Sequence, residues 1–253
     1  QTVKEGNWVP IREIPCNDEV ASLLSSFNSM IVIQTKMRDD LIEAEKLKQQ
    51  LSLNLLQQQV NPHFLYNTLD NICALAELDE KETLIQLVMN LSSFYRSSLS
   101  NGKMHISIGQ ELEISRAYLE ILQIRYFHKF DFTITCPEAL KNYSCIKLLL
   151  QPILENSIYH GIKGLDRHGI LHIEAEDAGY CIRFTISDNG RGFSKEDYEK
   201  IWQQDADHFG IKSIQQRILL YYGPGYGLSM ESPQTGCCIT VITLPKQEGL
   251  PCH

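Results

Sequence analysis

The stretch Gln57-Gln-Gln-Val-Asn-Pro-His-Phe-Leu-Tyr-Asn67 lies in the middle of a long helical pattern. Its proline, Pro62, removes one backbone hydrogen bond from a helix and clashes with the preceding turn, at a cost of about 3 kcal/mol. A histidine, His63, follows it at once. A proline that destabilises the helix, directly before a histidine that can act as a nucleophile or a base, indicates a function for both residues. We expect the helix to bend at Pro62.

Apolar residues recur at spacings of three and four on both sides of this stretch, which predicts one helical seam over about residues 18–76. A turn at 78–82 and a second amphipathic helix over 84–99, ended by Asn101-Gly102, complete a hairpin. A seam of this length needs a partner, and two hairpins form a dimeric four-helix bundle. The seam residues are Val20, Leu23, Phe27, Met30, Gln34, Met37, Leu41, Ala44, Lys48, Leu51, Leu55, Gln58, Pro62, Leu65, Leu69, Ile72 and Ala76.

The direction of His63 follows from the same helical pattern. At about 100° per residue, His63 lies roughly 140° from the centre of the seam, so we expect an exposed imidazole. Leu56, Val60, Phe64 and Asn67 fall on the same side, which predicts an apolar patch on the outer face of the bundle. These angles leave open the alternative that His63 has no chemical role and contributes only to packing or solubility.

The region 103–246 mixes helical and strand patterns, several of the strands alternating apolar and polar residues. A sheet with helices packed on it is an α/β sandwich, so the whole chain is predicted to be α+β. The expected helices are 109–128, 144–161 and 209–221, and the expected strands are 130–136, 168–176, 180–187, 227–232 and 236–244.

The composition narrows the class of protein. The chain has 253 residues, 43% hydrophobic and 21% charged, which is typical of a soluble globular protein. Its net charge of −8 argues against a nucleic-acid-binding surface. Eight cysteines without a C-x-x-C pair indicate reduced thiols. The sequence has no apolar stretch of 18 or more residues, so it predicts no membrane span. The polar, turn-rich start leads us to expect a piece of a longer protein.

Three segments of the second half have the chemistry of a nucleotide site, although the chain lacks a P-loop. In the first, Leu150–Gly161, Asn156 and His160 are four residues apart and share a helix face. An amide oxygen is a suitable hard ligand for Mg²⁺, which takes few protein ligands and keeps waters or phosphate oxygens. A helix cap or a buried polar network is the alternative for these side chains.

The other two segments follow at intervals. Asp188 ends a predicted strand and starts Asp-Asn-Gly-Arg-Gly, where a buried carboxylate would accept from an adenine amino group. Gly190 and Gly192 would let a base lie against bare backbone, although Asp-Asn-Gly is also a common turn. Gly210 opens a helix whose free N–H groups suit phosphate oxygens. Each segment is ambiguous alone, and the order and spacing of the three are specific.

These motifs carry a family resemblance that extends over nearly the whole chain. Residues 57–69, with Val-Asn-Pro-His-Phe-Leu-Tyr-Asn, closely resemble the phosphoacceptor box of the LytS/YesM-type sensor histidine kinases. Residues 144–244 resemble the Bergerat-fold (GHKL) ATP-binding domain shared by histidine kinases, DNA gyrase, Hsp90 chaperones and MutL. Residues 18–30 resemble the second helix of a HAMP signal-relay domain.

The resemblance implies ATP and Mg²⁺ as cofactors and a role for each matching residue. His63 would be the phosphoacceptor, Asn156 the Mg²⁺ ligand, and Glu155 a possible base for His63. The remaining residues implied for nucleotide binding are His160, Asp188, Gly190, Gly192 and Gly210.

Two departures from the family pattern affect these expectations. The last motif usually reads Gly-x-Gly-Leu-x-Asn, but here His208 replaces its first glycine and Ser213 its asparagine. We therefore expect a differently shaped lid or weaker ATP binding. Phe64 follows the histidine where many histidine kinases carry an acidic residue, so Phe64 cannot serve as the base.

The resemblance also implies an organisation and a set of partners. We expect a HAMP remnant at 1–40, dimerisation and phosphotransfer helices at 41–102, an ATP-binding catalytic domain at 103–246 and a tail at 247–253. The partners would be a second copy of the chain and a response-regulator receiver domain that takes the phosphoryl group on an aspartate. The full-length protein would be anchored at the cytoplasmic face of a bacterial membrane. Alternatives are a degenerate kinase acting as a relay or phosphatase, and an ATP-driven clamp.

Overall fold

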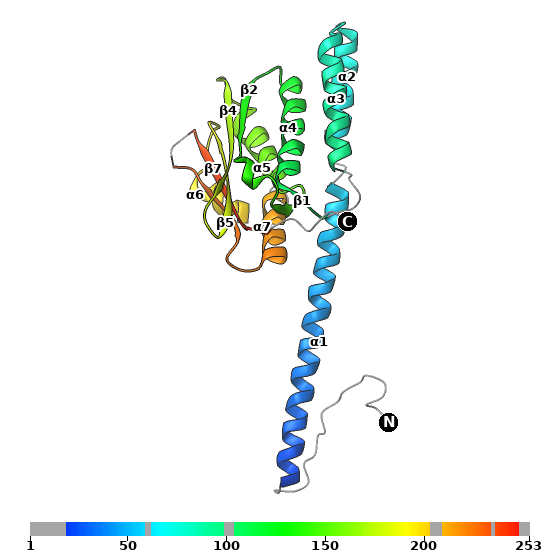
Figure 1. Cartoon of the computed structure of the whole chain (residues 1–253), viewed down its shortest axis with the longest axis vertical. Coiled ribbons are helices and arrows are strands. Elements are labelled where there is room, and N and C mark those ends of the chain that lie inside the picture. Colours follow the sequence, from blue (N-terminus) through cyan, green and yellow to red (C-terminus); the bar gives the residue numbers. More distant parts are fainter. Residues whose placement is uncertain (1–18, 59–61, 99–103, 203–208, 234–235, 248–253) are drawn as a thin grey trace. The chain divides into compact units, whose positions relative to one another are not determined.

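The computed structural model describes residues 19–58, 62–98, 104–202, 209–233 and 236–247 (Figure 1). The chain divides into two units, Gln1–Gln57 and Gln58–His253. Within the described residues, every helix is too short or too polar to cross a membrane.

The first unit contains one long helix, α1 (Glu19–Gln58). Four residues of the predicted seam, Leu23, Met30, Met37 and Leu41, are more than half exposed along it. A single helix of 40 residues gains little stability from propensity alone and usually depends on packing of its apolar face. The exposed seam is therefore consistent with the predicted need for a partner.

The second unit begins with the predicted hairpin, made of α2 (Pro62–Glu77) and α3 (Lys81–Ser98). Pro62 is the first residue of α2, a position where the missing N–H has no helical partner to lose. The turn contains Asp79 in the left-handed region, with φ of 57°. Residues 59–61 and the predicted stop at 101–102 lie outside the described residues, so the bend at Pro62 stays a prediction.

Helix α4 (Ile108–Arg125) packs along the hairpin and links it to the rest of the unit. A capping box fixes its start, because the Ser107 side chain accepts from the Gln110 N–H while the Gln110 side chain accepts from the Ser107 N–H. Helix α3 buries Leu87, Asn90, Phe94 and Ser98, one residue for each helical turn.

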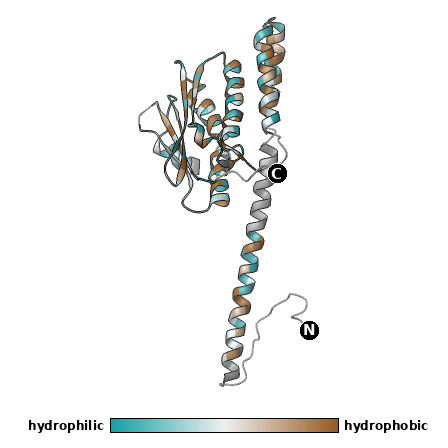
Figure 2. Cartoon of the chain, viewed as in Figure 1, coloured by the Kyte–Doolittle hydropathy of each residue, from teal (hydrophilic) through white to brown (hydrophobic). Residues whose placement is uncertain are grey.

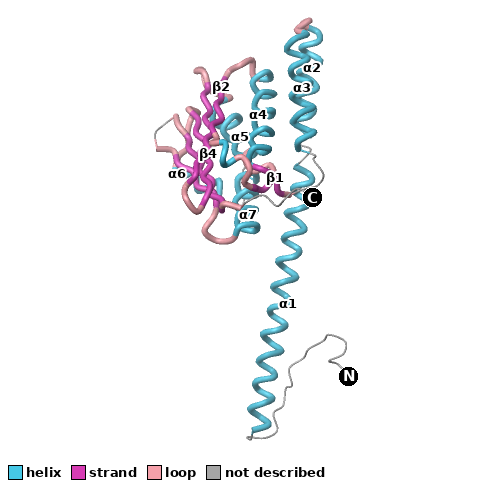
Figure 3. The backbone as a smooth tube through the Cα atoms, viewed as in Figure 1, coloured by secondary structure: helices cyan, strands magenta, loops and turns pink. Residues whose placement is uncertain are grey.

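Five strands form the sheet that was predicted, in the order β2-β4-β5-β7-β6. Strand β2 is parallel to β4, and the other neighbours are antiparallel. Helices α4, α5 and α7 cover one face (Figures 1 and 3), which confirms the predicted α+β class. The bounds are β2 (Phe130–Thr135), β4 (Gly169–Asp177), β5 (Cys181–Asp188), β6 (Gly227–Glu231), β7 (Cys238–Pro245), α5 (Gln151–Asn156) and α7 (Phe209–Tyr222).

The predicted helix over 144–161 is wrong in its first half. Strand β3 (Ser144–Ile146) pairs with β1 (His105–Ser107), and Leu148 follows with φ of 54°, which no α-helix contains. Helix α5 then continues into a π-helical segment, η4 (Ser157–Ile162). The short elements η3 (Glu138–Leu140) and α6 (Lys195–Trp202) were not predicted either, because each lacks a long periodic pattern.

The core lies between the covered face of the sheet and these helices, and Figure 2 shows hydrophobic residues along both. Strands β4, β5 and β7 bury alternate residues, as expected when one face is packed and the other faces water. Fully or nearly fully buried residues of this core include Leu119, Leu122, Leu154, Ile158, Leu171, Ile173, Phe184, Ile186, Ile214, Ile218, Ile242 and Leu244.

A buried carboxylate and a buried guanidinium fix the segment that precedes α5. The Glu111 carboxylate accepts from the N–H groups of Leu148 and Leu150, at 2.8 and 2.9 Å. The Arg217 guanidinium donates to the carbonyls of Lys147 and Leu148. Burial raises the pKa of Glu111, opposed by these N–H groups and by Arg217. The strained turn that aims α5 is therefore held from both α4 and α7.

Candidate functional site

His63 is exposed on the first turn of α2, as the helical angles predicted. Its Nδ1 lies 3.1 Å from the Asn67 side-chain nitrogen, one turn further along. A donating amide makes Nδ1 the acceptor and leaves the proton on Nε2, whereas an accepting amide oxygen would reverse the tautomer. Asn67 therefore sets which ring nitrogen of His63 carries the lone pair.

Phe64 does not belong to an exposed patch, and this part of the prediction is wrong. Its side chain is only 2% exposed and packs against Tyr118 and Phe94, with ring centroids 5.0 and 5.4 Å apart. The angles placed Phe64 correctly away from the seam, but they could not show that α4 covers that side. Val60 and the Leu56 side chain lie outside the described part of the chain.

Helix α5 and η4 bring Glu155, Asn156 and His160 to one side of the second unit. The Glu155 carboxylate accepts from the Tyr118 hydroxyl at 3.1 Å and from the Gln151 amide at 3.0 Å. Asn156 is half-buried, and His160 is exposed. Short π-helical segments occur often at functional sites, and this one begins directly after Asn156.

Asp188 ends β5 as a buried carboxylate, only 4% exposed. One oxygen accepts from the Gly190 N–H at 2.9 Å, while Oδ2 receives no hydrogen bond from any described residue. Burial raises the pKa of Asp188, opposed by the nearby Ser157 hydroxyl and the Gly190 N–H. A buried acceptor without a donor costs free energy, so this oxygen is suited to a ligand that donates.

Two of the predicted glycines are required by close approach. A Cβ on Gly190 would lie 2.7 Å from the Cα of Gly161, so this backbone can only be bare. Gly192 has φ of 70°, and a Cβ there would meet the Ser232 hydroxyl at 2.6 Å. The chain therefore passes Gly161 and Ser232 too closely for a side chain at either glycine.

Two adjoining cavities bring together residues from all three predicted segments. Asn156 and His160 line both of them, which places the Asp188 side and the Gly210 side next to each other. His208 lies outside the described residues. The first cavity is lined by Asn156, Ser157, His160, Gly161, Asp188, Arg191, Gly192, Phe193, Asp197 and Cys238. The second is lined by Pro152, Glu155, Asn156, Tyr159, His160, Gly210 and Ile211.

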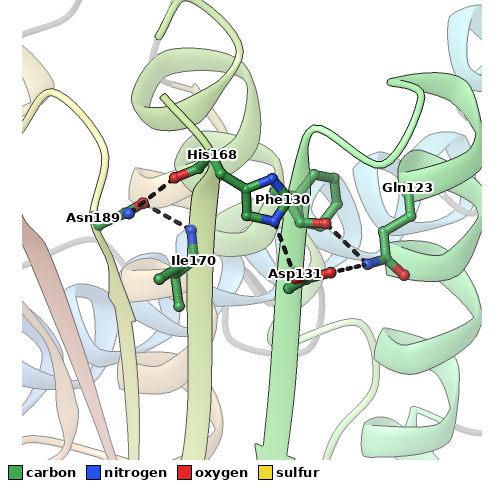
Figure 4. A network of polar contacts seen from close by, with 6 residues as sticks. All are labelled: Gln123, Phe130, Asp131, His168, Ile170 and Asn189. Atoms are coloured by element: carbon green, nitrogen blue, oxygen red, sulfur yellow. Dashed lines mark hydrogen bonds and ion pairs between the residues drawn. The ribbon is translucent and has the colours of Figure 1, made fainter. Parts of the chain in front are cut away.

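Side chains from neighbouring elements hold the loop that follows Asp188. The Asn189 oxygen accepts from the Ile170 N–H at 2.7 Å, and its nitrogen donates to the His168 carbonyl at 3.1 Å (Figure 4). The Arg167 guanidinium donates to three carbonyls, those of Asn189, Gly190 and Gly236. The loop is thus fixed to β4 and to the turn between β6 and β7.

Two family models match the chain. The model described as histidine kinase matches residues 51–130, and the one described as histidine kinase-, DNA gyrase B- and HSP90-like ATPase matches residues 143–248. The first contains His63, and the second contains Asp188 and both cavities. The chain belongs to the histidine kinases.

Among individual histidine kinases, the chain is similar to sensor proteins of the LytS/YesM type. The sensor histidine kinase YesM of Bacillus subtilis is 31% identical over 228 residues, which cover 90% of this chain and 39% of that protein. The sensor histidine kinase BtsS of Escherichia coli is 33% identical over 196 residues, covering 78% and 34%. The sensor protein LytS of Staphylococcus haemolyticus is 27% identical over 225 residues, covering 86% and 37%.

The chain therefore spans less than two fifths of the length of these curated relatives. A solved structure of the histidine kinase ThkA in complex with the response regulator protein TrrA aligns with a TM-score of 0.47 at 15% identity. That alignment covers 83% of this chain and 66% of the other.

Sequence reasoning about this kinase missed several residues of the site. Cys238 lines the first cavity because β7 places it opposite Asp188, and a strand register cannot be read from one sequence. Tyr118 reaches Glu155 from 37 positions away. Of these residues, Asn67 could have been predicted from the sequence as a partner of His63, because residues four apart are neighbours on a helix.

Proposed function

We propose that this chain is the kinase part of a sensor histidine kinase, which transfers the γ-phosphoryl group of ATP to His63. The phosphoryl group then passes to an aspartate of a response regulator. One observation carries the proposal: an exposed imidazole on α2 lies in the same unit as a cavity lined by the buried carboxylate of Asp188, whose Oδ2 has no donor among the described residues. Phosphoryl transfer depends mainly on positioning and charge neutralisation, which such a unit supplies.

We propose that Asp188 accepts a hydrogen bond from the adenine amino group through its Oδ2 atom, which has no hydrogen-bond donor among the described residues. Gly190 and Gly192 admit the base against bare backbone, and His160 lines both cavities between the two ends of the nucleotide. Gly210 brings the start of α7 close to Pro152, since a Cβ there would lie 3.3 Å from the Pro152 Cβ. That helix start suits the phosphates.

Asn156 is our proposed ligand for Mg²⁺. Its amide lines both cavities, and no hydrogen bond ties it to another described residue. The described residues contain no group of three His, Cys, Asp or Glu side chains that could hold a metal ion. A single amide ligand fits Mg²⁺, which binds proteins through few groups and shares phosphate oxygens, where it would neutralise charge.

Glu155 is our candidate for the group that takes the proton from the His63 imidazole. Phe64 is excluded because its side chain is apolar and buried. The Glu155 carboxylate is held by Tyr118 and Gln151, and it lies next to the proposed metal ligand in the chain. A positioned carboxylate is a competent general base.

We expect Asn67→Leu to slow His63 phosphorylation by about two- to tenfold at saturating ATP, the effect of one hydrogen bond. The substitution removes the group that fixes the imidazole tautomer but touches no residue of the nucleotide cavities. ATP binding should be unchanged in a calorimetric titration. Tyr66→Leu, at an exposed position on the same helix, is the matched control. An unchanged rate in Asn67→Leu would remove Asn67 from the proposal.

We expect Arg167→Ala to weaken ADP binding by about tenfold, because the loop under the base loses its bridge to Gly236. Arg167→Lys should recover most of the affinity, since an ammonium also donates to carbonyls. Isothermal titration with ADP measures both variants. Arg183→Ala, which removes an exposed arginine paired with Glu176, serves as the control. Equal affinities for Arg167→Ala and the unsubstituted chain would contradict the prediction.

We also propose the assembly that the sequence predicted. The hairpin exposes Leu69, Ile85, Val88 and Met89, which supports pairing with a second copy in a four-helix bundle. We keep the proposed divisions 1–40, 41–102, 103–246 and 247–253. The full-length protein would be anchored in the membrane by segments outside this chain, with the kinase at the cytoplasmic face. Nucleic acid is not a proposed partner, since the net charge is −8.

Incubation with γ-labelled ATP and Mg²⁺ tests the proposal against its rivals. A kinase yields acid-labile, alkali-stable phosphoprotein and passes the label to a receiver domain. An ATP-driven clamp hydrolyses ATP without labelling itself. A degenerate kinase, for which the His208 and Ser213 departures argue, stays unlabelled and turns over no ATP.

A further inference from the structure

We infer that Tyr118 is a positioning residue that links docking of the phosphoacceptor helix to the placement of the Glu155 carboxylate. The inference deepens the proposed function and rests on it. To the hydrogen bond between Tyr118 and Glu155 it adds a contact of Tyr118 with the phosphoacceptor hairpin, so that α2, α4 and α5 are connected.

The link is a continuous chain of side-chain contacts. The ring of Phe64, the residue next to His63, lies tilted against the Tyr118 ring with centroids 5.0 Å apart, and the ring centroid of Phe94 in α3 lies 5.8 Å from that of Tyr118. The Tyr118 hydroxyl donates to Glu155 Oε1 at 3.1 Å. One fully buried side chain therefore touches the phosphoacceptor hairpin with its ring and the proposed base with its hydroxyl.

The hydroxyl group of Tyr118 indicates a function beyond packing of the aromatic ring. A position that needed only an aromatic ring in the core would be satisfied by phenylalanine, which has no buried polar atom to satisfy. Burial, together with the negative charge of Glu155, raises the pKa of Tyr118 well above its usual range. Both effects disfavour loss of the phenolic proton, which is the proton that the hydroxyl donates to Glu155.

The contact transmits movement because Phe64 and His63 are adjacent on a rigid helix. When α2 docks on α4, the Phe64 and Phe94 rings confine Tyr118, and its hydroxyl points at Glu155. When α2 leaves, the Tyr118 ring gains rotamer freedom, and the hydrogen bond from its hydroxyl to Glu155 is no longer held in one direction by the Phe64 and Phe94 rings. The contribution of Tyr118 to the position of this carboxylate therefore depends on α2 being packed against α4.

The test is Tyr118→Phe in the whole chain, with Tyr95→Phe as the matched control. Tyr95 also packs on Phe94, but its buried hydroxyl has no hydrogen-bond partner among the described residues. We expect Tyr118→Phe to lower the His63 phosphorylation rate at saturating ATP about tenfold, with the KM for ATP within twofold. Tyr95→Phe should change neither.

A double-substitution cycle separates linkage from simple loss of packing. Phe64→Leu should lower the rate in the unsubstituted chain but much less in Tyr118→Phe, because the link is already broken there. Additive effects, or a Tyr118→Phe variant with the normal rate, would overturn the inference. If Tyr118→Phe does not fold, the same cycle is run with Phe64→Leu and Glu155→Gln, and additivity again overturns it. An unsubstituted chain that never labels itself would instead refute the proposed function, and this inference with it.

Discussion

Replacing His63 with glutamine should abolish acid-labile phosphoprotein altogether, while ATP binding stays within about twofold of that of the unsubstituted chain. Glutamine lacks a ring nitrogen that can form a phosphoramidate, and no other group on the first turn of α2 replaces it. His63 is exposed and lines neither nucleotide cavity, so its loss leaves the nucleotide contacts intact. Labelling with γ-labelled ATP measures the first quantity, and calorimetric titration measures the second.

A second histidine provides the control for this substitution. His172 is exposed on β4, where its Nδ1 lies 2.6 Å from the Thr133 hydroxyl, and His172→Gln should label normally. Label that persists in His63→Gln would place the acceptor elsewhere in the chain. ATP hydrolysis without label in both proteins would favour the ATP-driven clamp.

The parts of this protein that could be predicted are those with a long periodic or compositional signal. The hairpin of α2 and α3 follows from apolar spacings, and the strands β4, β5 and β7 follow from strict alternation. Gly190 and Gly192 could be named because the order and spacing of the three nucleotide segments are specific, and both glycines approach their neighbours closely in the structure.

The errors lie where tertiary contacts decide. Phe64 was assigned to an outer face because helical angles describe one helix and contain nothing about α4, which buries it. The strand β3 was read as helix because three residues show no period, and its pairing with β1 joins segments about forty residues apart. Cys238 and Tyr118 reach the site through register and packing, neither of which a single sequence displays.

Replacing Asp188 with asparagine should weaken ATP binding by about 100-fold. The carboxylate oxygen Oδ2 has no donor among the described residues, and a hydrogen bond to a charged acceptor contributes about 1.5–3 kcal/mol. Asparagine can keep an oxygen toward the Gly190 N–H, but its amide nitrogen then faces the adenine amino group, and two donors repel. Titration with ATP measures the loss, and normal affinity would remove Asp188 from the proposed adenine contact.

The same substitution should not destabilise the empty protein, which distinguishes a binding residue from a structural one. Burial raises the pKa of Asp188, so its contribution to stability is full below the ordinary aspartate pKa and is lost as pH rises through the raised value. Asp188→Asn carries no charge, so we expect its Tm to equal or exceed that of the unsubstituted chain at pH 7, with the gain vanishing in acid. Asp177 is the control of opposite sign, because the hydrogen bond from Lys246 lowers its pKa and its contribution is lost as pH falls. Calorimetry between about pH 4 and 7 decides the matter, and a lower Tm for Asp188→Asn at pH 7 would show that the ionised carboxylate stabilises the fold itself.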